Sequence, residues 1–364
     1  MYKVKLLKPD GRTLYLYSQR PIPEGIEATN PLNEAASPTP HMRWHPLRQE
    51  WIIYAAHRQG RTFLPPKNYS PLSVTKSADF PTEMPEGDYE VAVFENLFPS
   101  LNLTTEESPQ LSVPTRPAQG ICEVVVFTQN PETSLGELPL SRIELIFQVW
   151  GDRTKELMKD GKIHYVLPFE NKGIEMGVTL HHPHGQIYAY PFIPPIPAQM
   201  LTAMKKHFEQ HGEGMMERII NDELSSNIRV IHEGKHSVAF VPVFARYPYE
   251  TWVAPKRKTA YMFDLSEEER KDLALTLKIV LMKFDRLWQK PFPYLMTLYQ
   301  APTEKIPHEE AHLFFQITPP YRTSNKLKFL AGTELGAGVF VNDSLPEEKA
   351  QELKKVDVGK MSDE

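Results

Sequence analysis

Cysteine is nearly absent from this sequence, whose 364 residues contain only Cys122. A single thiol excludes an internal disulfide and every zinc site that needs two thiolates, so a disulfide-stapled secreted protein is excluded. We therefore expect a reducing compartment, the cytoplasm. Long apolar runs are also missing: no uninterrupted stretch reaches 18 residues, and residues 1–12 lack the apolar core of a signal peptide. We expect no interaction with a membrane.

The sequence also lacks a strong charge of either sign. Its 41 Lys and Arg residues face 46 Asp and Glu residues, a formal net charge of −5, whereas a nucleic-acid-binding protein usually has a basic surface. Glycine is scarce beside proline, with 18 residues against 34. The prolines and the 41% of hydrophobic residues indicate a folded protein with many irregular connections, of a length that corresponds to about two domains.

A weak internal repeat organises the chain. Ser-x-x-Glu boxes, which start helices, occur at Ser141 and Ser266, 125 residues apart, and the double prolines at Pro194 and Pro319 are separated by the same distance. A strand precedes each box, at 124–127 and 251–254. Apolar residues then recur at helical spacing, first at Ile143, Ile146, Phe147, Trp150 and Leu157, and then at Leu273, Leu277, Val280, Phe284 and Leu287.

Each copy continues with a strand, at 165–171 and 294–300, and ends with an alternating strand, at 186–195 and 313–320. We predict an α+β fold of two duplicated units, each an antiparallel sheet with helices packed on it. The predicted organisation is an N-terminal extension over 1–43, with a hairpin turn around Asp10, a catalytic domain over 44–196 and a degenerate copy over 197–364. The copies differ in one place, where the first has His181-His182-Pro183-His184-Gly185-Gln186 and the second has Pro307 to His312.

The histidine segment is the candidate for chemistry. If residues 182–190 are extended, His182, His184 and Gln186 project from one face of a strand, and Gly185 lets a ligand approach the backbone. Two imidazoles and an amide suit nucleophilic attack on a phosphoryl or acyl centre, because one imidazole attacks while the amide donates hydrogen bonds to the developing oxyanion. A metal site and a hydrogen-bonded structural element remain alternatives at this point.

The segments 169–173 (Phe-Glu-Asn-Lys-Gly), 177–179 (Gly-Val-Thr) and 182–187 (His-Pro-His-Gly-Gln-Ile) resemble the active-site stretch of galactose-1-phosphate uridylyltransferases. That family belongs to the histidine-triad superfamily, so the resemblance implies two tandem histidine-triad-like units with half-barrel sheets. It also implies a ping-pong reaction without an external cofactor. His184 would attack the α-phosphorus of UDP-glucose, with His182 in support and Gln186 holding phosphoryl oxygens, and UMP would then pass to galactose 1-phosphate.

The resemblance assigns further substrate-binding residues one by one. In the segment 57–61 it implicates two arginines in phosphate binding, and in the segment 94–99 an asparagine and a phenylalanine in uridine binding, although Leu97 stands where the family often has a polar or basic residue. Three more positions would line the nucleotide phosphates. Two residues near the C-terminus would reach the hexose in the partner's site, which predicts a homodimer. These residues are Arg58, Arg61, Asn96, Phe98, Asn171, Gly177, Thr179, Lys328 and Glu334. Without the resemblance, 57–61 would be a solvated basic loop and 328–334 a surface strand ending in a turn.

The metal ligands of the family are missing from the matching positions. Zinc-binding members use two cysteines and two histidines, and here Ser70, Ser73 and Asn130 accompany His182. The second metal site of some members corresponds to Met200, Tyr299, Phe314 and Gln316. We therefore predict an enzyme that binds neither zinc nor iron. His41, His45, His308 and His312 form a loose reserve of possible ligands.

Two other functions remain open. One is a related nucleotidyl transfer, such as phosphorolysis of an ADP-sugar or a dinucleotide polyphosphate, through the same His184 intermediate. The other is a nucleotide-sugar-binding protein without catalysis, which the presence of His184, Gln186 and the arginines disfavours, because binding alone does not require a nucleophile.

Overall fold

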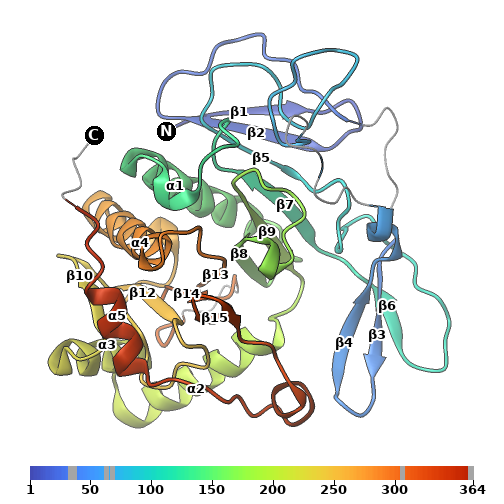
Figure 1. The fold of residues 1–364 in the computed structure, drawn as a ribbon. Coiled ribbons are helices and arrows are strands. Elements are labelled where there is room, and N and C mark those ends of the chain that lie inside the picture. Colours follow the sequence, from blue (N-terminus) through green and yellow to red (C-terminus); the bar gives the residue numbers. More distant parts are fainter. Residues whose placement is uncertain (32–38, 61–64, 66–69, 304–307, 360–364) are drawn as a thin grey trace. The chain divides into compact units, whose positions relative to one another are not determined.

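The computed structural model of this chain describes residues 1–364 except 32–38, 61–64, 66–69, 304–307 and 360–364 (Figure 1). The chain folds into two compact units. Unit 1 comprises residues 1–132, 153–167 and 179–194, and unit 2 comprises 133–152, 168–178 and 195–364. The segments interleave because helix α1 (Leu140–Leu157) and strand β8 (Tyr165–Lys172) each begin in one unit and end in the other. The predicted domain boundary at 196/197 falls next to residue 195, where the last segment of unit 2 begins.

Unit 1 contains an antiparallel sheet in the strand order β1-β2-β5-β7-β9. The strands are β1 (Tyr2–Leu7), β2 (Thr13–Ser18), β5 (Val91–Glu95), β7 (Ile121–Val126) and β9 (His184–Tyr190). The predicted N-terminal hairpin is present, and its second strand pairs with β5, so the first 18 residues are part of this sheet. Its apolar core includes Leu14, Leu16, Ala92, Phe94, Val124 and Val126.

A second, three-stranded sheet of unit 1 projects from the first (Figure 1). It consists of β3 (His41–His45), β4 (Glu50–Tyr54) and β6 (Thr115–Pro117), with β3 in the middle. One face carries Met42, Trp51 and Ile53 into a cluster with Tyr188 and Tyr190 of β9. The apolar side chains of this small sheet therefore anchor it beside the strand that carries the histidine segment.

Unit 2 contains an antiparallel sheet in which the C-terminal part of β8 is followed by β13-β14-β12-β11-β10. The strands are β10 (Val230–Glu233), β11 (Ser237–Phe240), β12 (Thr251–Pro255), β13 (Tyr294–Tyr299) and β14 (Phe314–Thr318), and β15 (Tyr321–Thr323) pairs with β16 (Lys326–Leu327). The helices are α2 (Pro195–His211), α3 (Met215–Ser226), α4 (Glu267–Leu287) and α5 (Pro346–Lys354). The predicted α+β class with antiparallel sheets is confirmed.

The two predicted helices bury the apolar faces expected from their periodicity. In α1, Ile143, Ile146, Phe147 and Trp150 are buried, and the rings of Phe147 and Phe315 lie 5.3 Å apart. The Ser266 capping box is confirmed, because Ser266 Oγ accepts from Glu269 N and Glu269 Oε2 accepts from Ser266 N. The Ser141 box is wrong as a helix start. Helix α1 begins at Leu140, directly after Pro139, and therefore places Ser141 inside the first turn.

No helix in the described part of the chain combines the length and the apolar character needed to span a bilayer.

Candidate active site

Strand β9 places His184 and Gln186 on one face of the unit 1 sheet. The strand alternates between half-buried residues, which begin with His184 and Gln186, and buried residues, which begin with Gly185. The antiparallel register pairs His184 with Val126 and Gln186 with Val124, so these four residues share a face. The predicted alternation is confirmed for this strand.

His182 does not share that face as a strand residue, because β9 begins only at His184. Its side chain is buried, and its Nε2 lies 2.7 Å from the carbonyl oxygen of Thr128. Since a carbonyl oxygen can only accept, Nε2 carries the proton. Nδ1 is then left without a hydrogen-bond partner among the described residues. Burial lowers the pKa of His182 to about 4, which keeps this ring neutral.

The ring of His184 is oriented by its own chain. Its Nδ1 lies 2.7 Å from the carbonyl oxygen of His182, so Nδ1 donates and Nε2 keeps its lone pair. Burial lowers the pKa of His184 below its ordinary value, and the ring is therefore neutral at neutral pH. A neutral imidazole with an oriented Nε2 lone pair is the form that can attack an electrophile. The contribution of His182 to this geometry comes from its backbone carbonyl.

The arginine segment and the predicted uridine segment meet in unit 1. Arg58 lies in a 3-10 helix (Ala56–Gly60) that follows β4, and its Nη1 donates to the carbonyl oxygen of Phe98 at 2.5 Å. His57 Nε2 donates to the carbonyl oxygen of Pro99 at 2.8 Å. Asn96 Oδ1 accepts from Phe98 N at 2.9 Å and stabilises the turn after β5. Arg61 lies outside the described residues.

The remaining predicted binding residues are divided between the units. Thr179 is a half-buried residue of unit 1, and Asn171, Gly177, Lys328 and Glu334 belong to unit 2. Gly177 has a φ of 73°, which favours glycine, and it ends a 3-10 helix (Ile174–Met176).

Lys328 and Glu334 are buried and bind each other, with Nζ and Oε1 3.1 Å apart. Their pairing closes the loop between them, because Glu334 Oε2 also accepts from Ala331 N. Whether they reach a sugar stays a prediction.

Unit 2 repeats the geometry of the histidine strand without a histidine at the position of His184. His312 is buried, and its Nε2 donates to the carbonyl oxygen of Pro255, as His182 does to that of Thr128. Gln316 pairs with Trp252 across β14 and β12, as Gln186 pairs with Val124. Phe314 therefore stands where His184 stands in unit 1.

This correspondence differs from the predicted one, which placed residues 307–312 opposite 181–186. The His-x-Phe-x-Gln pattern of residues 312–316 was the signal that could have revealed it.

Several side chains at the expected metal positions have hydrogen-bond or apolar partners instead. Ser70 Oγ accepts from Leu72 N at 3.3 Å, and no group of three or more His, Cys, Asp or Glu side chains in the described part of the chain could hold a metal ion. The orphaned Nδ1 of His182 would suit a ligand, but it has no companions there. At the second position, Met200, Tyr299 and Phe314 belong to a hydrophobic cluster, and Gln316 Nε2 donates to Glu250 at 2.7 Å.

Sequence models of one family match nearly the whole chain. The model described as galactose-1-phosphate uridyl transferase, N-terminal domain, covers residues 31–194, and its C-terminal counterpart covers 201–363. A galactose-1-phosphate uridylyltransferase of Thermotoga maritima is 37% identical over 325 residues, which are 87% of this chain and 98% of that protein. A protein of Streptomyces lividans with the same description is 33% identical, and the alignment covers 98% of each chain.

Solved structures agree with this result. A structure described as a uridylyltransferase has a TM-score of 0.78 and 33% identity, and the match covers 86% of this chain and 97% of the other. An ADP-glucose phosphorylase from Arabidopsis thaliana, solved with bound ADP-glucose, has a TM-score of 0.68 and 25% identity, over 88% and 100% of the two chains. Because both halves match and the relatives align over almost their full length, the chain belongs to the galactose-1-phosphate uridyl transferase family of nucleotidyltransferase enzymes.

Proposed function

We propose that this chain transfers UMP from UDP-glucose to galactose 1-phosphate through a covalent uridylyl intermediate on Nε2 of His184. The observation that carries the proposal is the 2.7 Å hydrogen bond from His184 Nδ1 to the carbonyl oxygen of His182, because it leaves the Nε2 lone pair for attack. The lowered pKa of His184 supports the same reading, since the neutral ring is the nucleophile.

The reaction balances in two steps. In the first, Nε2 forms a bond to the α-phosphorus of UDP-glucose, the bond from that phosphorus to the bridging oxygen breaks, and glucose 1-phosphate leaves with the electron pair. The uridylylated ring is then cationic, and the carbonyl of His182 accepts a charge-assisted hydrogen bond from Nδ1. In the second step, a phosphate oxygen of galactose 1-phosphate attacks the same phosphorus, the P–N bond breaks and the neutral ring is restored.

Gln186 and Arg58 are proposed to handle the phosphoryl charge. Gln186 lies two residues from His184 on the same face of β9, about 7 Å along the strand, so its amide can donate to oxygens of a phosphorus bound at Nε2. Arg58 suits phosphate binding because its planar guanidinium pairs with two oxygens at once. Its bond to Phe98 places it beside the loop expected to hold uridine.

We propose further that the enzyme acts as a homodimer whose C-terminal loop completes the site of the partner. Apolar side chains on this segment are exposed in the single chain, with Phe329 at 77%, Leu335 at 60% and Val339 at 59%. Such exposure is typical of surfaces that bind another protein.

A mixing experiment tests this arrangement. Inactive His184→Ala and Glu334→Ala chains, unfolded and refolded together, should recover about a quarter of full activity, because half of random dimers are mixed and each has one intact site. Recovery of no activity, with both variants folded, would contradict the shared site.

The proposal includes no metal and places the enzyme in the cytoplasm. The apolar cluster around Phe314 and the serines at 70 and 73 support the first statement, and the single buried thiol of Cys122 supports the second. Elemental analysis of chain purified without chelator checks the first, since about one zinc per chain would refute it.

A labelling experiment tests the reaction. The chain is incubated with α-labelled UDP-glucose and, separately, with α-labelled ADP-glucose, and acid-labile label on the protein is measured. Label from UDP-glucose that disappears in His184→Ala supports the proposal. His181→Ala is the matched control, because His181 is an exposed neighbour and should retain full labelling. Label from ADP-glucose alone would favour the alternative function, a nucleotidyl transfer from an ADP-sugar. This arm is included because an ADP-glucose phosphorylase is 26% identical to the chain over 341 residues.

A further inference from the structure

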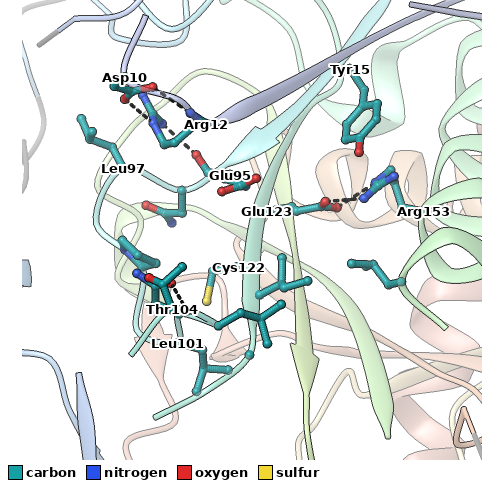
Figure 2. A pocket seen from close by; sticks show the side chains of 17 residues that line it. Asp10, Arg12, Tyr15, Glu95, Leu97, Leu101, Thr104, Cys122, Glu123 and Arg153 are labelled. Atoms are coloured by element: carbon teal, nitrogen blue, oxygen red, sulfur yellow. Dashed lines mark hydrogen bonds and ion pairs between the residues drawn. The ribbon is translucent and has the colours of Figure 1, made fainter. Parts of the chain in front are cut away.

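Unit 1 contains a cavity whose charged side chains lie apart from the face that carries His184. Its volume is about 360 Å³, within the range of small-molecule sites, and Figure 2 shows the side chains around it. The N-terminal hairpin contributes Asp10, Arg12 and Tyr15, the end of β5 contributes Glu95, and β7 contributes Glu123. The hairpin precedes residue 31, where the family model begins to match.

The strand register places the charged side of this cavity on the opposite face from the nucleophile. Val124 and Val126 share the face of Gln186 and His184, so Glu123, which directly precedes Val124 in β7, points the other way. Glu95 lies directly opposite Glu123 across β5 and β7 and therefore shares its face. Asn96, which lines the cavity at the end of β5, connects its rim with the loop expected to hold uridine.

The cavity contains a buried cation with one unused donor. Arg153, 3% exposed, donates from Nε to Glu123 Oε2 at 3.0 Å and from Nη2 to Glu123 Oε1 at 2.6 Å. Its guanidinium lies 4.1 Å from the ring centre of Tyr15. Nη1 is buried and has no hydrogen-bond partner among the described residues. A buried donor without an acceptor is unfavourable, so an acceptor from a ligand would be favoured there.

The charges around the cavity disfavour an anion. Arg12 binds Asp10 through Nε at 2.5 Å and donates through Nη1 to the carbonyl oxygen of Glu95 at 2.7 Å. With Arg153 neutralised by Glu123, the exposed carboxylate of Glu95 remains, and its Oε1 accepts only a weak bond from Thr13 N at 3.3 Å. The lining thus has three carboxylates and two guanidiniums. A metal ion is not favoured either, because the described residues include no group of three ligands.

We propose that this cavity binds a neutral monosaccharide. A hydroxyl group both donates and accepts, so one sugar ring can donate to the Glu95 carboxylate and accept from Arg153. A phosphorylated sugar would add negative charge beside Glu95 and bind more weakly. The site is separate from the transfer reaction and does not depend on its chemistry.

Isothermal titration of D-galactose and D-glucose tests the proposal. The His184→Ala chain is first saturated with UDP-glucose, so that the catalytic face is occupied and no turnover occurs. We expect saturable binding of one sugar per chain. Glu95→Ala should lower the affinity about tenfold, because it removes one charge-assisted hydrogen bond. Thr104→Phe, which places a ring in the cavity from an exposed lining position, should weaken it at least as much. Asp88→Asn, an exposed carboxylate of the same unit, is the matched control and should bind normally.

Three results would overturn the proposal. The first is the absence of saturable binding of either sugar up to tens of millimolar. The second is binding that Glu95→Ala and Thr104→Phe both leave unchanged. The third is tighter binding of galactose 1-phosphate than of galactose. Two further measurements distinguish failure of the sugar site from failure of the proposed function. They are a transferase assay on the unmodified chain and the same titrations without UDP-glucose. If the transferase is inactive but the sugar effects persist, only the reaction is refuted.

Discussion

Lys8 connects the N-terminal hairpin to the rest of unit 1. Replacing it by methionine tests how much this connection contributes to the free energy of unfolding. The side chain is fully buried, and Nζ donates to Thr29 O at 2.7 Å, Glu83 O at 2.8 Å and Glu83 Oε2 at 2.7 Å. Lys8→Met keeps the length of the side chain but leaves two buried carbonyls and one carboxylate oxygen without this donor.

The expected loss follows from these partners. Each lost hydrogen bond lowers the free energy of unfolding by about 1 kcal/mol, and a buried acceptor left unsatisfied lowers it further. An uncompensated buried charge would lower it by about another 3–5 kcal/mol. Glu83 is not left alone, because Arg12 Nη2 still lies 3.0 Å from its Oε2. We therefore expect Lys8→Met to lower the free energy of unfolding by about 3 kcal/mol.

Urea unfolding followed by circular dichroism measures this change, and hydrogen exchange should show faster exchange in β1 and β2. Lys5→Met is the matched control, since Lys5 is an exposed lysine of β1 and its replacement should change the stability by less than about 0.5 kcal/mol. A loss below about 1 kcal/mol for Lys8→Met would refute the reasoning, because the three hydrogen bonds would then be replaceable by water or by packing.

Three further predictions concern the site and the two units. Because burial lowers the pKa of His184, single-turnover uridylylation should persist below the ordinary histidine pKa and fall only at more acidic pH; a loss of rate centred above pH 6.5 would contradict this. Gln186→Ala should lower kcat by roughly 10²–10³ while the fold is retained, as checked by kinetics and circular dichroism. An unchanged kcat would refute the proposed role of Gln186 in binding the phosphoryl oxygens. Burial lowers the pKa of His312 to about 4, so the unfolded chain binds an extra proton between the ordinary pKa and that value. Stability in urea should therefore fall as pH drops through this window, and less steeply in His312→Gln; equal slopes would refute the role of His312.

The unit 2 strand shows why a duplicated fold does not duplicate the chemistry. His312 and Gln316 repeat the positions of His182 and Gln186, but Phe314 stands at the position of His184 and packs against Trp252, with ring centres 4.7 Å apart. His312 and Gln316 are hydrogen-bonded within unit 2. In unit 1 the backbone carbonyl of His182 orients the ring of His184, so the same strand geometry holds a packed phenyl ring in one unit and an oriented imidazole in the other.

Local periodicity and capping were sufficient to predict several elements. The apolar faces of α1 and α4, the alternation of β9 and the N-terminal hairpin follow from side-chain spacing, which is a property of the chain alone. The Ser266 box was predictable for the same reason. The start of α1 was not, because Ser141 satisfies the local pattern equally well and only the surrounding fold selects Leu140.

The sequence by itself determined the family and the fold class, because a short motif and a repeated pattern of apolar residues carry them. Tertiary structure alone decided that the backbone carbonyl of His182 binds the His184 ring, that Lys328 binds Glu334, and that Arg153, Glu123 and the hairpin line one cavity. These contacts join residues far apart in the chain, or depend on where a strand begins or on how a loop folds back. Their geometry and burial arise only when the strands, helices and loops pack together, so no local pattern could reveal them.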